Sequence, residues 1–402
     1  MKPRASSPCR RLVTEAGVVP VPCETWPSER RSTPPRSGGP DAVTEHAVTQ
    51  EQTEHARPDD ADARADLSHD QARGPRWAAS PGETPPVEQV AEVGGRIQAE
   101  VARVLVGKDE VVRLAVVCLL SEGHLLIEDV PGTGKTSLAK ALALAVAADV
   151  SRVQFTPDLM PTDVTGGSIY NRLTSEFEFR PGPIFANIVV ADEINRASPK
   201  TQSALLEAME EHQVSVDGTT YTLARPFLVL ATQNPVEMEG TFPLPEAQRD
   251  RFLAQTSIGY PAADAELEML LDRDQVDPLT SVRPVTDDAG VLAMAAAVRR
   301  VHLAPQVRSY LVGIVRATRG LPSVRLGASP RAALHLARAA KASAALAGRP
   351  YVVPDDVSAL AVPVLAHRML LGPATPGSPH RTTHELVSAL VSRAQVPRGT
   401  RG

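Results

Sequence analysis

The spacing of apolar residues changes twice along the chain. Residues 1–84 show no apolar period and are filled by proline, glycine and charged residues, a composition typical of disorder. Further along, Val90, Val93 and Ile97 recur at the three- and four-residue intervals of an amphipathic helix. Unbroken apolar runs, such as 125–127 and 188–191, instead match strands that are buried on both faces. The pattern predicts a disordered extension followed by an ordered α/β region.

Strand and helix patterns alternate through the first half of this ordered region. The expected strands are 125–127, 150–156, 187–192, 227–232 and 254–259. Strands that alternate with helices predict a doubly wound parallel sheet with both faces covered. Ligands of such sheets bind beyond the carboxyl ends of the strands. Around Asp217 and Gly218, alternating β-forming residues also predict a hairpin over 214–223.

The remainder of the chain reads as a small helical domain. Its expected helices are 287–300, 305–318, 330–347, 354–370 and 383–393. Several of them begin with proline and end near glycine, as helices commonly do. The predicted organisation is a disordered extension at 1–84, an α/β core at 85–262, a linker at 263–285, the helical domain at 286–395 and a tail at 396–402.

Directly after the first predicted strand, glycine, lysine and threonine follow one another in an order that suits phosphate binding. Gly132 and Gly134 precede Lys135 and Thr136, and an Ala- and Leu-rich helical segment follows. The glycines let backbone N–H groups point at a polyphosphate, while the new helix adds free donors and a positive dipole end. The lysine would neutralise phosphate charge and the threonine hydroxyl would ligate Mg²⁺. Asp129 stands where the strict pattern has its first glycine.

Two further strands end in polar residues with a chemical use. The strand at 187–192 ends in Asp192 and Glu193, of which one can hold Mg²⁺ and the other can orient an attacking water. The strand at 227–232 leads to Asn234, whose amide can bond the γ-phosphate or that water, or can simply start an Asn-Pro turn. The turn at 106–108 packs against a nucleotide base or is an ordinary helix–helix turn.

Composition narrows the classes of partner. The 402 residues carry a net charge of −5, so no overall basic field points to nucleic acid. Only 3 cysteines are present, and their spacing suggests neither a disulfide framework nor a zinc site, which fits a reducing cytoplasm. No apolar stretch is long enough to span a bilayer, and the basic N-terminus lacks the apolar segment of a signal peptide. We expect a cytoplasmic protein without a membrane span or a nucleic-acid partner.

Four stretches give the chain a specific resemblance. They are 179–185 (FRPGPIF), 190–197 (VADEINRA), 231–235 (ATQNP) and 244–252 (LPEAQRDRF). Together with the phosphate loop, they make the sequence similar to MoxR-family AAA+ ATPases over about residues 87–393. Members of that family also carry Glu-Asp or Glu-Gly before Val-Pro-Gly, so Asp129 does not count against the loop. The long extension at 1–84 departs from the family.

The resemblance implies a role for each motif residue. ATP would be bound by Glu128, Asp129, Val130, Pro131, Gly132, Thr133, Gly134, Lys135, Thr136, Ser137 and Asp192. Mg²⁺ would be held by Thr136 and Asp192. Residues 132–136 correspond to Walker A and Asp192-Glu193 to Walker B. Glu193 would activate water and Asn234 would act as sensor 1. The segment 155–179 would contain inserted elements, and the hairpin at 214–223 would face the pore of a ring.

Two arginines complete the implied catalytic set. Arg251 resembles the arginine finger that one subunit supplies to its neighbour, with Arg249 as the alternative. Arg331, within Ala-Ser-Pro-Arg, resembles sensor 2 of the helical lid and is expected to serve the phosphates of its own subunit.

The expected function is therefore Mg²⁺-dependent ATP hydrolysis coupled to chaperone-like remodelling or maturation of protein clients. The resemblance further implies a ring, expected to be a hexamer, and a partner with a von Willebrand factor A domain. One alternative is the ATPase subunit of a metal-chelatase-like motor, against which the form of residues 246–252 argues. Another is a nucleotide-gated scaffold with little turnover, against which intact Lys135, Asp192 and Glu193 argue.

Overall fold

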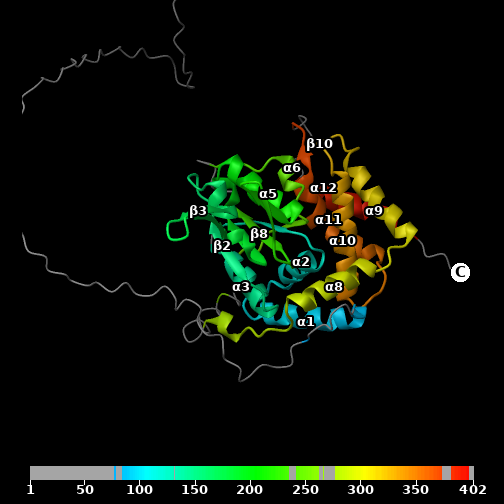
Figure 1. Cartoon of the computed structure of the whole chain (residues 1–402). Coiled ribbons are helices and arrows are strands. Elements are labelled where there is room, and N and C mark those ends of the chain that lie inside the picture. The colour runs from blue at the N-terminus through cyan, green and yellow to red at the C-terminus, as the bar shows by residue number, and fades with distance from the viewer. Residues whose placement is uncertain are drawn as a thin grey trace, which may run out of the picture. The chain divides into compact units, whose positions relative to one another are not determined.

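Five parallel strands form the central sheet in the computed structural model of the chain (Figure 1). They are β1 (Leu125–Glu128), β2 (Val150–Gln154), β5 (Ile188–Asp192), β8 (Leu228–Gln233) and β9 (Ala254–Thr256). Their order across the sheet is β2-β5-β8-β1-β9, and every neighbouring pair is parallel. The predicted α/β class is confirmed. Two of the five expected strands, β2 and β9, end earlier than the ranges predicted for them, 150–156 and 254–259.

The structure describes most of the chain from residue 84 onward. The described residues are 77, 84–130, 132–234, 241–261, 266, 277–373 and 382–397. Nearly all of the expected disordered extension, much of the expected linker, most of the expected tail and Pro131 therefore lie outside the described residues, and the expectations for them stay predictions.

The sheet buries both faces because side chains alternate along each strand. Leu125 and Ile127 of β1 join one hydrophobic cluster, whereas Leu126 between them joins the other. The first cluster includes apolar residues of α1 (Val87–Ala102), α2 (Asp109–Leu120) and α3 (Lys135–Ala145). The second includes Leu205 and Leu206 of α5 (Pro199–Glu211). This two-sided burial explains why β1 and β5 read as unbroken apolar runs.

Inserted elements lie between β2 and β5 and between α5 and β8. The first insertion contains α4 (Pro161–Thr165) and the hairpin of β3 (Gly166–Asn171) with β4 (Glu176–Pro181). The second is the hairpin of β6 (Gln213–Val216) and β7 (Thr219–Thr222), as the Asp-Gly pattern predicted. Gly166 has φ +84°, and a Cβ there would lie 2.3 Å from the Arg180 carbonyl oxygen, so only glycine fits this start of the hairpin.

The helical region beyond residue 286 forms the second part of the structure. It comprises α8 (Asp288–Arg300), α9 (Pro305–Thr318), α10 (Pro330–Leu346), α11 (Pro354–Leu365) and α12 (Thr383–Arg393), with a short β10–β11 pair (Val324–Leu326 and Leu370–Leu371). The helix expected at 354–370 ends at Leu365 and is followed by a 3-10 turn at Ala366–Arg368, because Leu370 and Leu371 pair with β10 instead of continuing the helix. Among the described residues, no helix has the length and apolar character needed to cross a bilayer.

Packing and polar contacts join the helical region to the α/β core. Apolar residues of α8 to α12 belong to the same cluster as those of α1, α2 and α3. The Ser329 hydroxyl, which caps α10, donates to Asp250 at 2.8 and 2.9 Å. The buried Arg368 guanidinium pairs with the same carboxylate at 2.9 Å. The segment around Asp250 is therefore one of the places where polar contacts join the two regions.

Candidate active site

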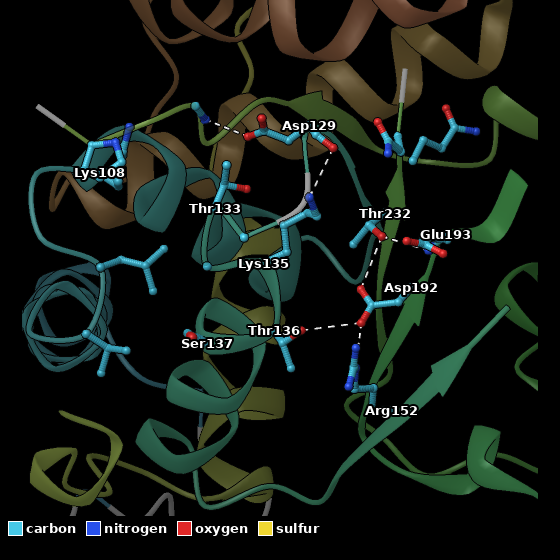
Figure 2. Close-up of a pocket in the computed structure, with 18 of the residues that line it drawn as sticks. Lys108, Asp129, Thr133, Lys135, Thr136, Ser137, Arg152, Asp192, Glu193 and Thr232 are labelled. Carbon is cyan, nitrogen blue, oxygen red and sulfur yellow. Dashed lines mark hydrogen bonds and ion pairs between the residues drawn. The ribbon is translucent and has the colours of Figure 1, made fainter. Parts of the chain in front are cut away.

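A cavity of about 370 Å³ opens at the carboxyl ends of β1, β5 and β8 (Figure 2). Its lining includes Asp129, Gly132, Thr133, Gly134, Lys135, Thr136, Ser137, Asp192, Glu193 and Asn234. The structure thus brings most of the predicted nucleotide-site residues together, although they come from distant parts of the sequence. The turn at 104–108 also contributes to the lining, consistent with the first of its two predicted readings.

The loop that precedes α3 takes its shape from two glycines. Gly132 and Gly134 have φ of +85° and +91°. Residues other than glycine adopt this left-handed backbone conformation only at a cost in free energy. Gly134 is the N-cap of α3, so the helix starts at Lys135. The free N–H groups of the first helical turn consequently lie beside the cavity.

Lys135 folds back onto the loop that precedes it. Its ammonium donates to the carbonyl oxygen of Val130 at 2.6 Å and to that of Asp129 at 3.1 Å. Burial lowers the pKa of Lys135 from its usual value, while the carboxylates of Asp129, Asp192 and Glu193 act in the opposite direction. The side chain is therefore a partly desolvated cation within reach of two carbonyls, which phosphate oxygens can replace.

Asp129 ties the loop to the segment after β9. Its buried carboxylate accepts hydrogen bonds from the N–H groups of Val130 (2.8 Å), Ile258 (2.8 Å) and Gly259 (2.6 Å). Burial raises the pKa of this carboxyl, but the three donors and the Lys135 charge outweigh it, so the net pKa lies below the usual value. An aspartate at this position thus holds the loop in place, a task that glycine could not perform.

Lys108 contacts the segment that Asp129 anchors. Its ammonium donates to the carbonyl oxygens of Ile258 at 2.5 Å and Tyr260 at 2.9 Å. The turn at 104–108 and the loop before α3 are therefore attached to the same stretch of chain. Neither contact follows from local sequence, since both join residues far apart in the chain.

Asp192 and Glu193 leave the end of β5 in different directions (Figure 2). Asp192 is buried; one carboxylate oxygen accepts from the Thr232 hydroxyl at 3.2 Å and the other from the Thr136 hydroxyl at 3.4 Å. Glu193 has φ +56°, and its N–H donates to the Thr232 hydroxyl at 2.9 Å. Thr232 of β8 therefore fixes both acidic residues, a role that the sequence did not reveal.

The strand β2 supplies two polar side chains that sequence reasoning missed. Arg152 pairs through Nε with Asp192 at 2.6 Å, and the Gln154 amide donates to Glu193 at 2.7 Å. Glu193 also pairs with Arg196 at 2.9 Å. Residues two apart on a strand share one face, and β2 is hydrogen-bonded to β5 with Gln154 opposite Asp192. That alternation was visible in the sequence, but the pairing of these two strands was not.

Not every residue expected at the nucleotide lines this cavity. Among the described residues, Glu128 accepts a hydrogen bond from Gln255 on the neighbouring strand, and Val130 contributes its carbonyl to Lys135. Asn234 follows β8 directly, is buried and lines the cavity beside Thr232. Its predicted contact with phosphate or water stays a prediction, as does the part of Pro131.

The two predicted catalytic arginines lie in a different cavity. Arg251 and Arg331 line a hollow of about 260 Å³ together with Glu210. The Glu210 carboxylate pairs with Arg251 Nε at 3.1 Å and with Arg331 through its other oxygen. Neither arginine lines the cavity that contains Lys135. The structure thus brings these arginines together with each other, but not with the remaining site residues of the same chain.

The chain matches two family models. The model for the ATPase family associated with various cellular activities (AAA) covers residues 124–254, and the AAA lid domain model covers residues 316–390. Together they span the candidate active site and most of the helical region.

Several known proteins are similar over about two thirds or more of the chain. Protein YeaC of Bacillus subtilis is 53% identical over 279 residues, which are 69% of this chain and 87% of YeaC. Chaperone MoxR1 of Mycobacterium tuberculosis is 46% identical over 281 residues, 68% of this chain and 74% of MoxR1. Protein MoxR of Paracoccus denitrificans is 33% identical and is covered over 95% of its length.

A solved structure supports the same assignment. The crystal structure of a protein from Cytophaga hutchinsonii, described as an ATPase, superposes with a TM-score of 0.70 at 36% identity. The superposition covers 78% of this chain and 99% of that one. The chain therefore belongs to the MoxR family of AAA+ ATPases.

Proposed function

We propose that this chain binds ATP with Mg²⁺ in the cavity at the carboxyl ends of β1, β5 and β8 and hydrolyses it to ADP and phosphate. The observation that carries the proposal is the convergence of Lys135, Thr136, Asp192 and Glu193 on one cavity. The set contains a cation, a hydroxyl and two carboxylates, which are the groups that phosphoryl transfer to water requires.

Nucleotide binding would rest on the loop and the start of α3. Backbone N–H groups at the helix N-terminus and the positive end of its dipole favour a polyphosphate. Lys135 would exchange the carbonyl oxygens of Asp129 and Val130 for phosphate oxygens, and so keep its charge satisfied. Because Asp129 fixes the loop through three hydrogen bonds, little further ordering is needed on binding.

The donors near Thr136 fit Mg²⁺. The Thr136 hydroxyl and the Asp192 carboxylate are hard oxygen ligands 3.4 Å apart, and Mg²⁺ commonly takes one or two protein oxygens together with phosphates and waters. Bound there, Mg²⁺ would offset the charge that develops on the phosphate oxygens.

Glu193 is the group proposed to orient the attacking water. It is held at the end of β5 by its backbone bond to Thr232 and lines the same cavity as Asn234. Gln154 and Arg196 both donate to Oε2 of its carboxylate, so the attacking water would donate to Oε1 or share Oε2. Asn234 would then bond the γ-phosphate or that water.

Arg251 and Arg331 are proposed to act on the nucleotide of a neighbouring subunit. Both are held by Glu210 in a cavity separate from their own Lys135. For Arg331 this proposal is an alternative to the role at its own subunit's phosphates, which the family resemblance implies and which stays a prediction. A ring, expected to be a hexamer, would bring the pair beside the next active site, where such arginines stabilise transition-state charge. Arg249 remains the alternative finger.

The biological output proposed for this ATPase is chaperone-like remodelling or maturation of client proteins in the cytoplasm. The support is the family membership and the name of the relative Chaperone MoxR1. A partner with a von Willebrand factor A domain belongs to the same proposal. A metal-chelatase-like role and a nucleotide-gated scaffold with little turnover remain the alternatives.

The proposal is tested by Lys135→Ala in the full-length chain. Nucleotide affinity, measured with a fluorescent ADP analogue, should fall severely because the phosphate charge loses its partly buried cation. Lys200→Ala, at an exposed position on α5, is the matched control and should bind as the wild type does. Equal affinity of wild type and Lys135→Ala would refute this site.

A further inference from the structure

The guanidinium of Arg152 contacts the carboxylate of Asp192, which together with Thr136 is a proposed Mg²⁺ ligand. Arg152 Nε lies 2.6 Å from Asp192 Oδ2, the same oxygen that accepts from the Thr136 hydroxyl at 3.4 Å (Figure 2). The other oxygen, Oδ1, accepts from Thr232. The cation therefore occupies the side of Asp192 that points toward Thr136, and not the side that β8 already satisfies.

The two partners of this ion pair differ strongly in exposure. The Asp192 side chain is 8% exposed, whereas the Arg152 side chain is 55% exposed. A buried carboxylate without a counter-charge is destabilising, so Asp192 gains from the pairing. Arg152 can leave the carboxylate at a smaller cost, because its side chain is already half exposed to solvent. Its guanidinium also donates to Gln154 of the same strand at 3.3 Å.

We propose that Arg152 is a positioning residue that holds Asp192 when no metal is bound and competes with Mg²⁺ for this carboxylate. The proposal rests on the assignment of Thr136 and Asp192 to Mg²⁺ made above. A divalent cation beside Asp192 supplies the counter-charge that the arginine otherwise supplies, and the two cations repel each other. Binding of Mg²⁺ and release of the Arg152 side chain into solvent are therefore linked.

Competition gives Arg152→Gln two effects of opposite sign. Without metal, the variant leaves Asp192 short of a counter-charge, so the melting temperature in EDTA falls. With ADP present, Mg²⁺ no longer has to displace a cation, so the metal enhances nucleotide binding more than it does in the wild type. A residue with a merely structural role would lower stability but would leave this enhancement unchanged.

The experiment measures the affinity of a fluorescent ADP analogue for the full-length chain in EDTA and in saturating Mg²⁺. The ratio of the two dissociation constants is the coupling between metal and nucleotide. For loss of an ion pair worth about 1 kcal/mol, this ratio should rise about fivefold in Arg152→Gln. Metal binding by the analogue in solution is common to both proteins and cancels in the comparison.

Two further variants sharpen the test. Arg299→Gln removes another exposed arginine, which pairs with Glu122. Neither residue lines the cavity with Lys135, so this variant should leave the ratio unchanged. In an Asp192→Asn background, Arg152→Gln should have no further effect on the ratio, because the competing carboxylate is gone. Arg152→Lys should lie between wild type and Arg152→Gln.

Several outcomes would overturn the proposal. An unchanged ratio in folded Arg152→Gln, while the wild type shows a clear Mg²⁺ effect, refutes the competition and leaves the proposed function intact. Weaker nucleotide binding in EDTA with an unchanged ratio would instead make Arg152 a phosphate ligand. If the wild type itself shows no Mg²⁺ effect, the metal site of the proposed function is wrong and the competition falls with it.

Discussion

Asp129 offers a direct test of how the phosphate loop is held. The change is Asp129→Ala, which removes the acceptor of the Val130, Ile258 and Gly259 N–H groups. The Ile258 donor lies in a buried contact, and a buried donor left unpaired costs about 1–3 kcal/mol. The other two bonds are partly buried and contribute about 1 kcal/mol each. The free energy of unfolding should therefore fall by about 3–5 kcal/mol.

The assay is thermal unfolding followed by circular dichroism, together with binding of a fluorescent ADP analogue. In folded regions of about 150 residues or more, a loss of 1 kcal/mol lowers the melting temperature by roughly 2–4 °C. Asp129→Ala should therefore melt roughly 10 °C below wild type. The loop must then be ordered on binding, and nucleotide affinity should fall by about threefold or more. Asp129→Asn keeps one oxygen and should lose about half as much stability.

The control is Glu92→Ala, at an exposed position on α1, which should change stability by less than about 0.5 kcal/mol. If Asp129→Ala melts within about 2 °C of this control, the three hydrogen bonds do not hold the loop, and the explanation for the missing glycine fails.

Two further predictions concern the core and the ring. Burial lowers the pKa of His124 to about 4, and its Nδ1 accepts from the Val229 N–H at 3.0 Å, so the folded state requires the neutral ring. The stability that the neutral His124 ring contributes is complete above its unfolded pKa of about 6.5 and is lost as the pH falls toward 4. Between pH 8 and pH 5, the free energy of unfolding of the wild type should therefore fall by about 2 kcal/mol more than that of His124→Gln. Equal losses for the two proteins in urea titrations would contradict this. Arg251→Ala and Lys135→Ala should each be nearly inactive alone but should partly restore hydrolysis when mixed into one ring. No recovery in rings shown to be mixed, or normal activity of Arg251→Ala alone, would exclude action on a neighbour, and loss in Arg249→Ala instead would move the finger.

The chemistry that depends on local order could be read from the sequence. Lys135 and Thr136 follow the glycines directly, and Asp192 and Glu193 end an apolar strand, so the placement of these residues needs only the carboxyl-edge rule for parallel sheets. The structure places all four beside one cavity.

What the sequence did not reveal depends on pairing between distant segments. The contact of Arg152 with Asp192 requires β2 to be hydrogen-bonded to β5, and Arg331 reaches Glu210 only through packing of α10 near the end of α5. The early end of α11 at Leu365 accompanies the pairing of Leu370 and Leu371 with β10. In each case contacts between distant segments decided the outcome, and apolar spacing carries no record of them.

The most direct test of the central claim is ATP turnover by Glu193→Gln. This change keeps the shape and the hydrogen-bonding capacity of the side chain but removes its carboxylate. If Glu193 orients the attacking water, the variant should bind ATP as the wild type does and hydrolyse it at least about a hundredfold more slowly, the lower end of such contributions. Hydrolysis at the wild-type rate, measured as phosphate release at saturating ATP and Mg²⁺, would contradict the account.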